Sequence, residues 1–397
     1  MDRGTHRTIR KRCGANSAAG TGAKGSKAMN ILILPSWYPT ADDPVRGSFF
    51  AEQAAALARF GHKVTVMTVY NDGESGVQTE KRTGGNLTEY LIHVKPLRFH
   101  LTFFRILREM RRLLRSGEKP DVIHVHSFYM AKYARVLRAL SGAPYVITEH
   151  VTWFERNVLS PRAQREAARA FSHADGVIAV SPGLRDTIRP LCGGKEIAVI
   201  PNLVNEDFFA RTQQAIPEKP FRFVSVGALM PKKGMDVLLE AFQSLVSSGA
   251  DVHLTICGGG AEEETLKAQA GGALTTGRVE FTGNISRQEV GRRLSESHAF
   301  VLASRVETFG VVFVEAMACG LPIIMTKTNA WELLAVPETG LSVPVDDTAA
   351  LANAMQRLME HYADYDAETI RRYCRENFSE TAICRRLTEL YEEVLTK

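Results

Sequence analysis

The sequence is poor in the features that mark membrane-spanning, secreted and metal-binding proteins. It has no apolar run that approaches the roughly 18–20 residues needed to cross a bilayer, so we do not expect an integral membrane protein. Its six cysteines are scattered, with no Cys-x-x-Cys pair and no histidine spaced to share a metal. They indicate a reducing, cytoplasmic setting rather than a disulfide framework.

A large excess of charge of one sign is also lacking once the first residues are set aside. The formal net charge is +5, but residues 1–28 hold seven lysines and arginines against one aspartate and contribute +6. Residues 29–397 therefore carry −1. This balance argues against a protein that binds nucleic acid through bulk charge.

The first 28 residues are basic, rich in Gly, Ala, Ser and Thr, and without apolar periodicity, which predicts a disordered tail. They contain no apolar stretch like that of a secretory signal. A transit peptide would share their basic, Ser-rich character. We favour a flexible tail or a start codon assigned too early, because Met29 directly precedes the first expected strand.

At 397 residues the chain exceeds what one hydrophobic core usually supports. Short β-branched runs alternate with helical patterns, and the alternation restarts halfway, which predicts two α/β domains with parallel sheets. We expect domains over residues 29–205 and 206–378, with Asn205–Pro220 as the linker. A last helical segment over residues 379–397, with its pattern at Glu380–Val394, is a candidate to cross back onto the first domain.

Parallel sheets in series leave a cleft between the domains, and ligands of such sheets bind beyond the carboxyl ends of the strands. The chemistry is therefore expected on loops that follow strands. The expected strands are Asn30–Leu34, Lys63–Val69, Asp121–Val125, Pro144–Thr148, Gly176–Val180, Ile197–Ile200, Phe221–Gly227, Val252–Cys257, Val279–Thr282, Ala299–Ala303 and Pro322–Met325. The expected helices include Ser48–Phe60, Ala131–Leu140, Pro161–His173 and Met235–Ser247.

One candidate loop, Gly227–Gly234, joins the strand at Phe221–Val226 to the helix at Met235–Ser247. Backbone N–H groups at the start of a helix favour an anion. Lys232 and Lys233 add point charges that suit a diphosphate. The alternative is a solvated turn with two surface lysines.

The glycine run 258–260 does not fit the Gly-x-Gly-x-x-Gly pattern of dinucleotide sites. Glu262, Glu263 and Glu264 fill the first turn of the following helix, where they would satisfy its dipole and repel a diphosphate. We interpret the glycines as points where the backbone approaches a ligand or a neighbouring element closely. This weighs against an oxidoreductase.

The most informative segment, Glu-Thr-Phe-Gly-Val-Val-Phe-Val-Glu, follows the strand at Ala299–Ala303. It predicts a turn at Phe309-Gly310 and a buried helix that Gly320 terminates. A carboxylate on such a helix must have partners. Ribose hydroxyls would satisfy Glu315, and sugar hydroxyls or a developing cationic carbon would suit Glu307. Two structural salt bridges are the alternative.

In the first domain, the loop Pro35–Gly47 follows the first strand, and Gly47 would let a substrate approach backbone N–H groups. His126 and His150 lie at the carboxyl ends of two later strands. A lone histidine is more often structural than catalytic, so neither carries much weight by itself.

Together these segments resemble the retaining nucleotide-sugar glycosyltransferases of family 4, which have the GT-B fold of two facing Rossmann-like domains. The resemblance runs from about Met29 to the C-terminus. It rests on the following segments: Asn30–Pro39, Gly227–Gly234, Glu307–Glu315, Ala316–Pro322, Pro201-Asn202 and Phe281–Gly283.

The resemblance implies a donor site on the second domain. Lys233 would grip the diphosphate within the Gly227 loop, beside Lys232, and Glu315 would hold the ribose hydroxyls. Glu307 would face the donor sugar. Two backbone N–H groups would point at sugar or phosphate, those of Phe309 and Gly310.

The resemblance also places two residues of the first domain at the site. Gly47 would lie beside the diphosphate, and His150 would contact the transferred sugar. The implied catalytic residues are Glu307, His150 and Lys233, and the family needs neither a metal nor a cofactor. The implied partners are a nucleoside-diphosphate sugar and a sugar, glycolipid or polysaccharide acceptor.

Two departures from the family pattern concern the residues that bind the donor diphosphate. Members commonly have Arg directly after the first glycine of the diphosphate loop, where this chain has Ala228. Lys232 or another base such as Arg305 would have to compensate. The first loop has Arg46-Gly47 where many members have paired glycines.

These observations predict a retaining, metal-independent glycosyltransferase in glycoconjugate or polysaccharide synthesis. Two alternatives remain at this point. A nucleotide-sugar epimerase of the same fold would release a changed donor, and a non-catalytic nucleotide-sugar-binding protein would turn nothing over.

The stretch Arg98–Arg115 has arginines opposite apolar side chains at helical spacing. A basic amphipathic helix can lie on an anionic membrane and reach a lipid-linked acceptor. An ordinary helix that covers a sheet, with a solvated face, is the alternative. The expected location is therefore the cytoplasm, with peripheral membrane attachment as one option.

Overall fold

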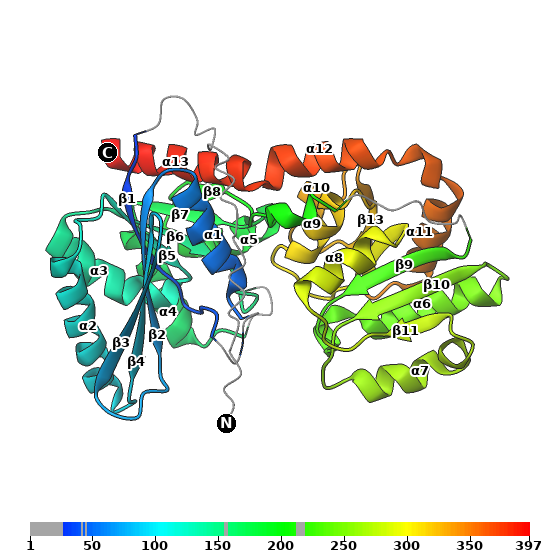
Figure 1. Ribbon diagram of the computed structural model, residues 1–397, viewed down its shortest axis with the longest axis horizontal. Helices are drawn as coiled ribbons and strands as arrows, with labels where there is room; N and C mark the ends of the chain where they lie inside the picture. Colours follow the sequence, from blue (N-terminus) through cyan, green and yellow to red (C-terminus); the bar gives the residue numbers. More distant parts are fainter. Residues whose placement is uncertain (1–26, 41–42, 44–45, 155–157, 212–218) are drawn as a thin grey trace, which may run out of the picture.

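The computed structural model describes residues 27–40, 43, 46–154, 158–211 and 219–397. Nearly all of the expected disordered tail, and residues 212–218 of the expected linker, lie outside these ranges. The described chain forms two lobes, each built on a sheet with helices packed against it (Figure 1). This confirms the α/β class and the pair of parallel-sheet domains.

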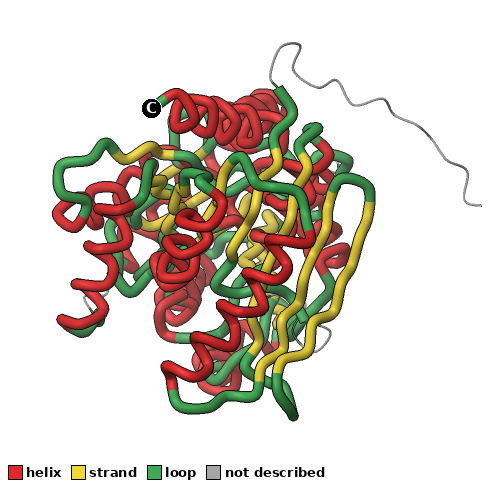
Figure 2. Tube along the Cα trace, turned by 90° about the vertical axis from the view of Figure 1, so that its left-hand side faces the viewer, coloured by secondary structure: helices red, strands yellow, loops and turns green. Residues whose placement is uncertain are grey.

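The first sheet has the order β3-β4-β2-β1-β5-β6-β7-β8. All neighbouring pairs are parallel except β3 and β4, a hairpin at one edge (Figure 2). The strands are β1 Asn30–Leu34, β2 Lys63–Tyr70, β3 Val77–Gly84, β4 Leu87–Val94, β5 Val122–His126, β6 Tyr145–Glu149, β7 Gly176–Ala179 and β8 Ile197–Val199. The helices are α1 Ser48–Arg59, α2 Phe99–Ser116, α3 Ala131–Ser141, α4 Pro161–His173 and α5 Pro182–Ile188.

The second sheet is parallel throughout, in the order β11-β10-β9-β12-β13-β14. Its strands are β9 Phe221–Val226, β10 Val252–Cys257, β11 Val279–Phe281, β12 Ala299–Leu302, β13 Ile323–Thr326 and β14 Gly340–Val343. Its helices are α6 Met235–Ser247, α7 Glu263–Thr275, α8 Arg287–Ser295, α9 Val311–Ala318, α10 Trp331–Leu334, α11 Thr348–Glu360 and α12 Ala367–Phe378.

Strand order reverses direction at one point in each sheet, and a crevice opens there between the loops that leave the two neighbouring strands. In the first sheet this point lies between β1 and β5, and in the second it lies between β9 and β12. The expected site loops follow three of these four strands. The topology therefore brings them to the places where open α/β sheets bind ligands.

The last helix, α13 (Glu380–Thr396), packs on the first domain (Figure 1). The Tyr391 hydroxyl lies 2.7 Å from His124 Nδ1 of β5, and Thr388 Oγ1 lies 2.9 Å from His62 Nε2. Arg59 of α1 and Glu380 form an ion pair at 2.5 Å. The chain thus returns to the first domain after completing the second.

The hairpin β3–β4 and strand β14 are not among the expected strands. β3 is mostly exposed and reads Val-Gln-Thr-Glu-Lys-Arg-Thr-Gly, so it lacks the apolar alternation by which a half-buried strand is recognised. β14 has only four residues, of which two, Leu341 and Val343, are aliphatic, so its apolar signal is weak. Among the described residues, no helix is long and apolar enough to span a membrane.

Candidate active site

The loop after β9 is held in place by glycine at the switch point of the second sheet. It contains a short 3-10 turn, Pro231–Lys233, and Gly234 caps α6 with a φ of 61°. A Cβ on Gly234 would stand 2.0 Å from the carbonyl oxygen of Ala303, at the end of β12. Only glycine therefore allows this loop to pack onto the neighbouring strand.

Lys233 and Glu307 meet at this point. Lys233 Nζ lies 2.6 Å from Glu307 Oε2, and the two side chains are only 15% and 13% exposed. Gly227 lies beside them, since a Cβ there would be 3.7 Å from Lys233 Cδ. The structure thus joins a cation and a carboxylate from the two loops that flank the switch point.

The turn at Phe309-Gly310 presents backbone rather than side chain. The Phe309 ring is buried against Phe378, with ring centroids 5.8 Å apart. Gly310 has a φ of 83°, and a Cβ there would meet the Phe313 ring at 2.7 Å and Glu307 Cγ at 3.0 Å. Among the described residues, no acceptor is found for the N–H groups of Phe309 and Gly310. They lie at the start of α9, where an anion is favoured.

The glycine run 258–260 makes the close backbone approach that we expected, and its neighbour is the Gly227 loop. A Cβ on Gly258 would stand 2.1 Å from the Gly227 carbonyl oxygen, and one on Gly260 would stand 2.2 Å from that of Leu229. Leu229 N donates to Gly259 O at 3.0 Å. The run therefore shapes the loop that carries Lys233.

Glu315 is buried on α9 and pairs with an arginine that lies outside the predicted site segments. Arg287, the first residue of α8, donates to Glu315 Oε1 at 2.6 Å and also contacts Glu52 of α1 in the first domain. Burial raises the pKa of Glu315, while Arg287 opposes this shift. Glu52, Arg287 and Glu315 form an ion-pair bridge between the two domains. The only sequence signal for it is an arginine just after the β11 loop.

The basic residues proposed to replace the missing arginine at Ala228 differ in their surroundings. Arg305 contacts Asp236 at 2.6 Å, Asp346 at 2.6 Å and the Pro231 carbonyl oxygen at 2.6 Å. It therefore fastens the Lys233 loop to its surroundings and has little capacity left for a ligand. Lys232 lies on that loop and its carbonyl oxygen accepts from Arg305 N at 2.8 Å.

In the first domain, Gly47 caps α1 with a φ of 73° and is buried. A Cβ on it would stand 2.8 Å from the backbone carbon and oxygen of Trp37. The loop after β1 therefore folds back tightly against the start of α1. This leaves the N-cap of α1 without a side chain.

His150 lies in a buried group of rings at the ends of β5 and β6. Its Nε2 is 3.1 Å from His126 Nδ1, and its ring centroid is 5.3 Å and 5.0 Å from those of Phe49 and Phe50. Burial lowers the pKa of His150 to about 3, and that of His126 well below its ordinary value. Both imidazoles are thus neutral at physiological pH.

Two of these ring nitrogens have unmet hydrogen-bonding capacity. In the part of the chain that the structure describes, neither His150 Nδ1 nor His126 Nε2 has a partner. Buried polar atoms are nearly always paired. A hydroxyl group of a bound substrate would satisfy such an atom, which suits the contact between His150 and a sugar.

Glu149, which no sequence motif marks, holds together the segments that follow β5 and β6. Its carboxylate accepts from the N–H groups of Phe128 at 3.1 Å, His150 at 2.9 Å and Val151 at 3.1 Å. Burial raises its pKa to about 7 despite these hydrogen bonds. The residue before His150 therefore fixes the position of His150.

The structure thus gathers the predicted residues into two groups. Lys233, Glu307, Gly227, Phe309 and Gly310 come together on the second domain, with Lys232 on the same loop. Gly47 and His150 lie on the first domain, and no hydrogen bond joins them to the former group among the described residues. Glu315 links the two sides through the ion-pair bridge.

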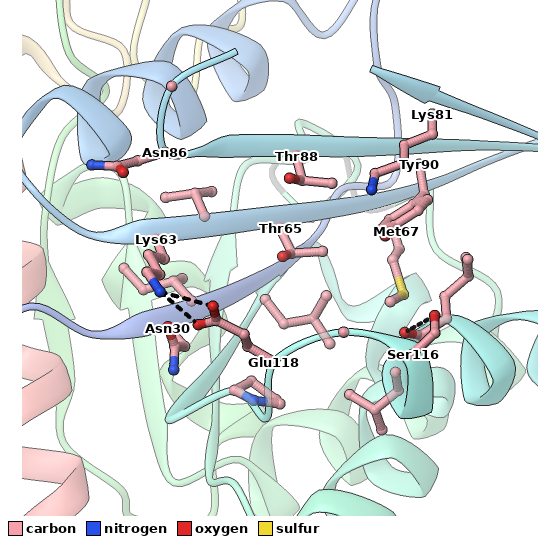
Figure 3. A pocket seen from close by; sticks show the side chains of 18 residues that line it. Asn30, Lys63, Thr65, Met67, Lys81, Asn86, Thr88, Tyr90, Ser116 and Glu118 are labelled. Carbon is pink, nitrogen blue, oxygen red and sulfur yellow. Dashed lines mark hydrogen bonds and ion pairs between the residues drawn. The ribbon is translucent and has the colours of Figure 1, made fainter. Parts of the chain in front are cut away.

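A separate hollow of about 320 Å³ begins at the amino ends of β1 and β2 (Figure 3). Lys63 and Glu118 form an ion pair at 2.8 Å there, and Thr88 and Tyr90 of β4 line the wall. Ligands of open parallel sheets bind at the opposite, carboxyl ends. We assign this hollow no part in the candidate site.

Two family models match the chain in succession. Residues 47–208 match the one described as Glycosyltransferase Family 4, and residues 206–378 match the one described as Glycosyl transferases group 1. Among curated relatives, a phosphatidyl-myo-inositol mannosyltransferase of Mycobacterium leprae is 31% identical over 300 residues, which cover 72% of this chain and 77% of the relative. A glycogen synthase of Mycobacterium tuberculosis is 26% identical over 362 residues, 84% of this chain and 86% of the relative.

Solved structures show the same fold. A sucrose-phosphate synthase of Thermosynechococcus elongatus aligns with a TM-score of 0.72 at 21% identity and covers 93% of this chain and 99% of its own. Anabaena HepE in complex with UDP aligns with a TM-score of 0.72 at 18% identity, over 92% and 100%. Together with the two-domain fold described above, these matches lead to one conclusion: the chain is a glycosyltransferase of family 4 with the GT-B fold.

Proposed function

We propose that the enzyme transfers a sugar from a nucleoside-diphosphate sugar to an acceptor hydroxyl with retention of the anomeric configuration, without a metal ion. The observation that carries this proposal is the Lys233–Glu307 pair at the switch point of the second sheet. A half-buried lysine near backbone N–H groups at a helix start suits a diphosphate. The UDP bound to the structurally similar HepE supports a donor of this class.

In the proposed mechanism the bond from the anomeric carbon to the diphosphate oxygen breaks, and its electron pair goes to the leaving group. Lys233, aided by Lys232 and by the N–H groups of Phe309 and Gly310, stabilises that negative charge. Glu307 faces the sugar, where its carboxylate suits hydroxyls and a developing positive charge. Glu315 holds the ribose hydroxyls of the donor.

The first domain completes the proposed arrangement. Gly47 leaves room for the diphosphate at the start of α1, and His150 contacts the transferred sugar through its unpartnered ring nitrogen. Because burial lowers the pKa of His150 to about 3, this imidazole is too weak a base to take the acceptor proton at neutral pH. That proton passes instead to an oxygen of the departing diphosphate, on the face from which the acceptor attacks.

The test is a screen of nucleotide sugars with product analysis. Transfer to an acceptor, or slow donor hydrolysis in its absence, is expected with at least one nucleoside-diphosphate sugar, and proton NMR of the first product should show the donor's anomeric configuration. An inverted product would disprove the retaining mechanism. Release of an epimerised nucleotide sugar would indicate the epimerase alternative, and binding without turnover would indicate a non-catalytic protein, for which Ala228 is the one sequence feature in favour. The relatives named above are transferases and synthases, which favours the transferase.

We also propose that α2 attaches the enzyme peripherally to anionic membranes. Its inner face covers the sheet through Ile106, Met110 and Leu113, while Arg108, Arg111, Arg112 and Arg115 are exposed. Near its start, Leu97, Leu101 and Phe104 are 41%, 46% and 63% exposed. Apolar side chains next to a basic helical face suit an anionic lipid surface.

Co-sedimentation with vesicles tests this attachment. The protein should bind vesicles that contain anionic phospholipid at low salt and leave them as salt rises. Phe104→Ser together with Arg108→Gln should weaken binding, whereas Lys267→Gln on α7 of the second domain should not. Absence of binding at low salt would rule out the membrane role.

A further inference from the structure

A second hollow in the first domain, of about 350 Å³, lies at the switch point of the first sheet. Its walls come from the segments that follow β1, β5 and β6, from the end of β2 and from the first turns of α2 and α3. This is the position at which open α/β sheets bind ligands. None of its residues belongs to the donor site described above.

The lining of this hollow is dominated by aromatic rings: Trp37, Phe103, Tyr129, Tyr133 and Trp153. Trp153 is 36% exposed, and its ring stands almost perpendicular to that of Tyr129, with centroids 5.6 Å apart. Phe103 stacks on Tyr133 at 5.1 Å. The rings therefore form flat walls that meet at an angle and stay accessible at one side.

Polar groups lie among these rings. Ser36, Asn71, Thr102 and Lys132 also line the hollow. The Ser36 hydroxyl donates to the His126 carbonyl oxygen at 2.8 Å and keeps its own oxygen as an acceptor, while Thr102 Oγ1 accepts from Leu97 N at 2.8 Å and keeps its proton as a donor. A few convergent polar groups on an aromatic surface fix the orientation of a ligand that has both flat apolar faces and hydroxyls.

The hollow shares a wall with the candidate active site. Gly47 lies against the backbone of Trp37, and the Trp37 and Phe50 rings stack at 6.3 Å, with Phe50 next to His150. Trp153 follows His150 by three residues. A ligand in the hollow would therefore lie beside the two residues of the first domain that we place at the donor, Gly47 at the diphosphate and His150 at the transferred sugar.

We propose that this aromatic hollow is the acceptor subsite and that it binds a hydroxylated ring, a sugar or cyclic polyol, by stacking the ring on its aromatic walls. The proposal rests on the proposed transferase function and names the acceptor class. The ring belongs either to a free saccharide or to the head group of a lipid. Leu101 and Phe104, which flank the lining residues Thr102 and Phe103 and are exposed, are placed to contact a lipid chain that leaves the hollow.

The first experiment measures binding without any donor. Two of the three tryptophans, Trp37 and Trp153, line the hollow, and the third, Trp331, lies on the second domain. The full-length Trp331→Phe variant therefore reports on the hollow by its intrinsic fluorescence. Titration with methyl α-glucopyranoside, methyl α-mannopyranoside and myo-inositol should change the emission with at least one probe, and Trp153→Ala in the same background should abolish the change. No change with any probe up to its solubility limit would overturn the proposal.

The second experiment measures transfer. Tyr129→Ala and Trp153→Ala should each raise the acceptor KM about tenfold, with donor hydrolysis in the absence of acceptor changed by less than about twofold. Tyr90→Ala, a half-buried tyrosine in the hollow of Figure 3, is the matched control and should leave both quantities unchanged. Equal losses in donor hydrolysis and in acceptor use would overturn the assignment of the hollow to the acceptor.

The two experiments separate failure of this inference from failure of the proposed function. If no nucleotide sugar is cleaved but a ring probe still changes the fluorescence, the transferase proposal fails and the ring-binding subsite stands. A lipid-linked acceptor is indicated if Leu101→Ser raises the KM for a glycolipid in vesicles but not for a methyl glycoside. Equal effects on both acceptors indicate a free saccharide.

Discussion

The second domain places charge at its switch point, whereas the first domain places neutral rings at the corresponding position. Lys233 and Glu307 form an ion pair at 2.6 Å in the second domain, while His150 and His126 are buried among phenylalanines in the first. A buried charge is useful where charge develops during a reaction. Neutral rings suit hydroxyl groups and flat sugar faces. We therefore propose that the second domain acts on developing charge and the first domain on uncharged groups, and substitutions can test that division.

The largest effect on kcat is expected from the charged residues of the second domain, Lys233 and Glu307. Lys233→Ala and Glu307→Gln should each lower kcat by about 10²–10³, because each removes a group that acts on the developing charge. Steady-state transfer assays measure this. Lys267→Ala, which removes a surface lysine paired with Glu263 and Glu264, should stay within about twofold of the parent. Near-normal transfer by Lys233→Ala or Glu307→Gln would contradict the role that we give to charge in the second domain.

A smaller effect on kcat is expected from the neutral rings of the first domain. His150→Gln should lower kcat by about tenfold, because it weakens one contact to an uncharged sugar. Since the His150 pKa is lowered to about 3, the ratio of wild-type to variant rates should not depend on pH between about 5 and 9. A wild-type inflection near pH 6–7 that the variant lacks would show that this imidazole titrates, contrary to our assignment.

The ion-pair bridge of Glu52, Arg287 and Glu315 between the two domains should affect stability. Arg287→Gln would leave Glu315 buried, with its side chain 10% exposed and no cationic partner, and should lower the free energy of unfolding by about 2 kcal/mol. Urea denaturation measures this. Glu315→Gln added to Arg287→Gln should recover part of the loss, because it removes the unpaired charge. No recovery would show that the effect arises elsewhere, for instance through the contact of Arg287 with Glu52.

The last prediction concerns the pH dependence of stability. The Glu149 pKa is raised to about 7 in the folded protein from about 4.5, so this group favours folding fully below pH 4.5 and loses that contribution as pH rises through 7. Glu149→Gln removes this titration. The difference in unfolding free energy between wild type and variant should therefore change between about pH 4.5 and 7 and be flat below that range. A flat difference throughout would contradict the raised pKa.

Most strands, and the two loops that carry Lys233 and Glu307, could be predicted from the sequence because their signals are local. β-branched runs mark the buried parallel strands, and Glu307, Phe309 and Gly310 stand close together in the chain. The neutral half could not be foreseen to the same extent. The hydrogen bond between His124 and Thr148 and the contact between His126 and His150 form only when β5 and β6 pair.

Contacts between side chains from distant segments were the hardest to predict from the sequence. Arg287 and Glu52 are 235 residues apart in the chain and meet only where the two domains contact each other. Nothing in the local pattern around Glu149 distinguishes a buried carboxylate that accepts three N–H bonds from an exposed one. For the same reason the sequence suggested Arg305 as a ligand for the donor, whereas tertiary packing gives it two aspartates.

The return of α13 to the first domain has a consequence for dissecting the enzyme. A fragment that stops at the domain boundary would lose Tyr391, Thr388 and Glu380, and with them the covering of buried His124 and His62. Such a fragment should expose an apolar surface and aggregate. A circularly permuted chain, in which α13 is joined ahead of β1, would instead deliver each lobe as a continuous stretch and would let the two lobes be mixed and reassembled in trans.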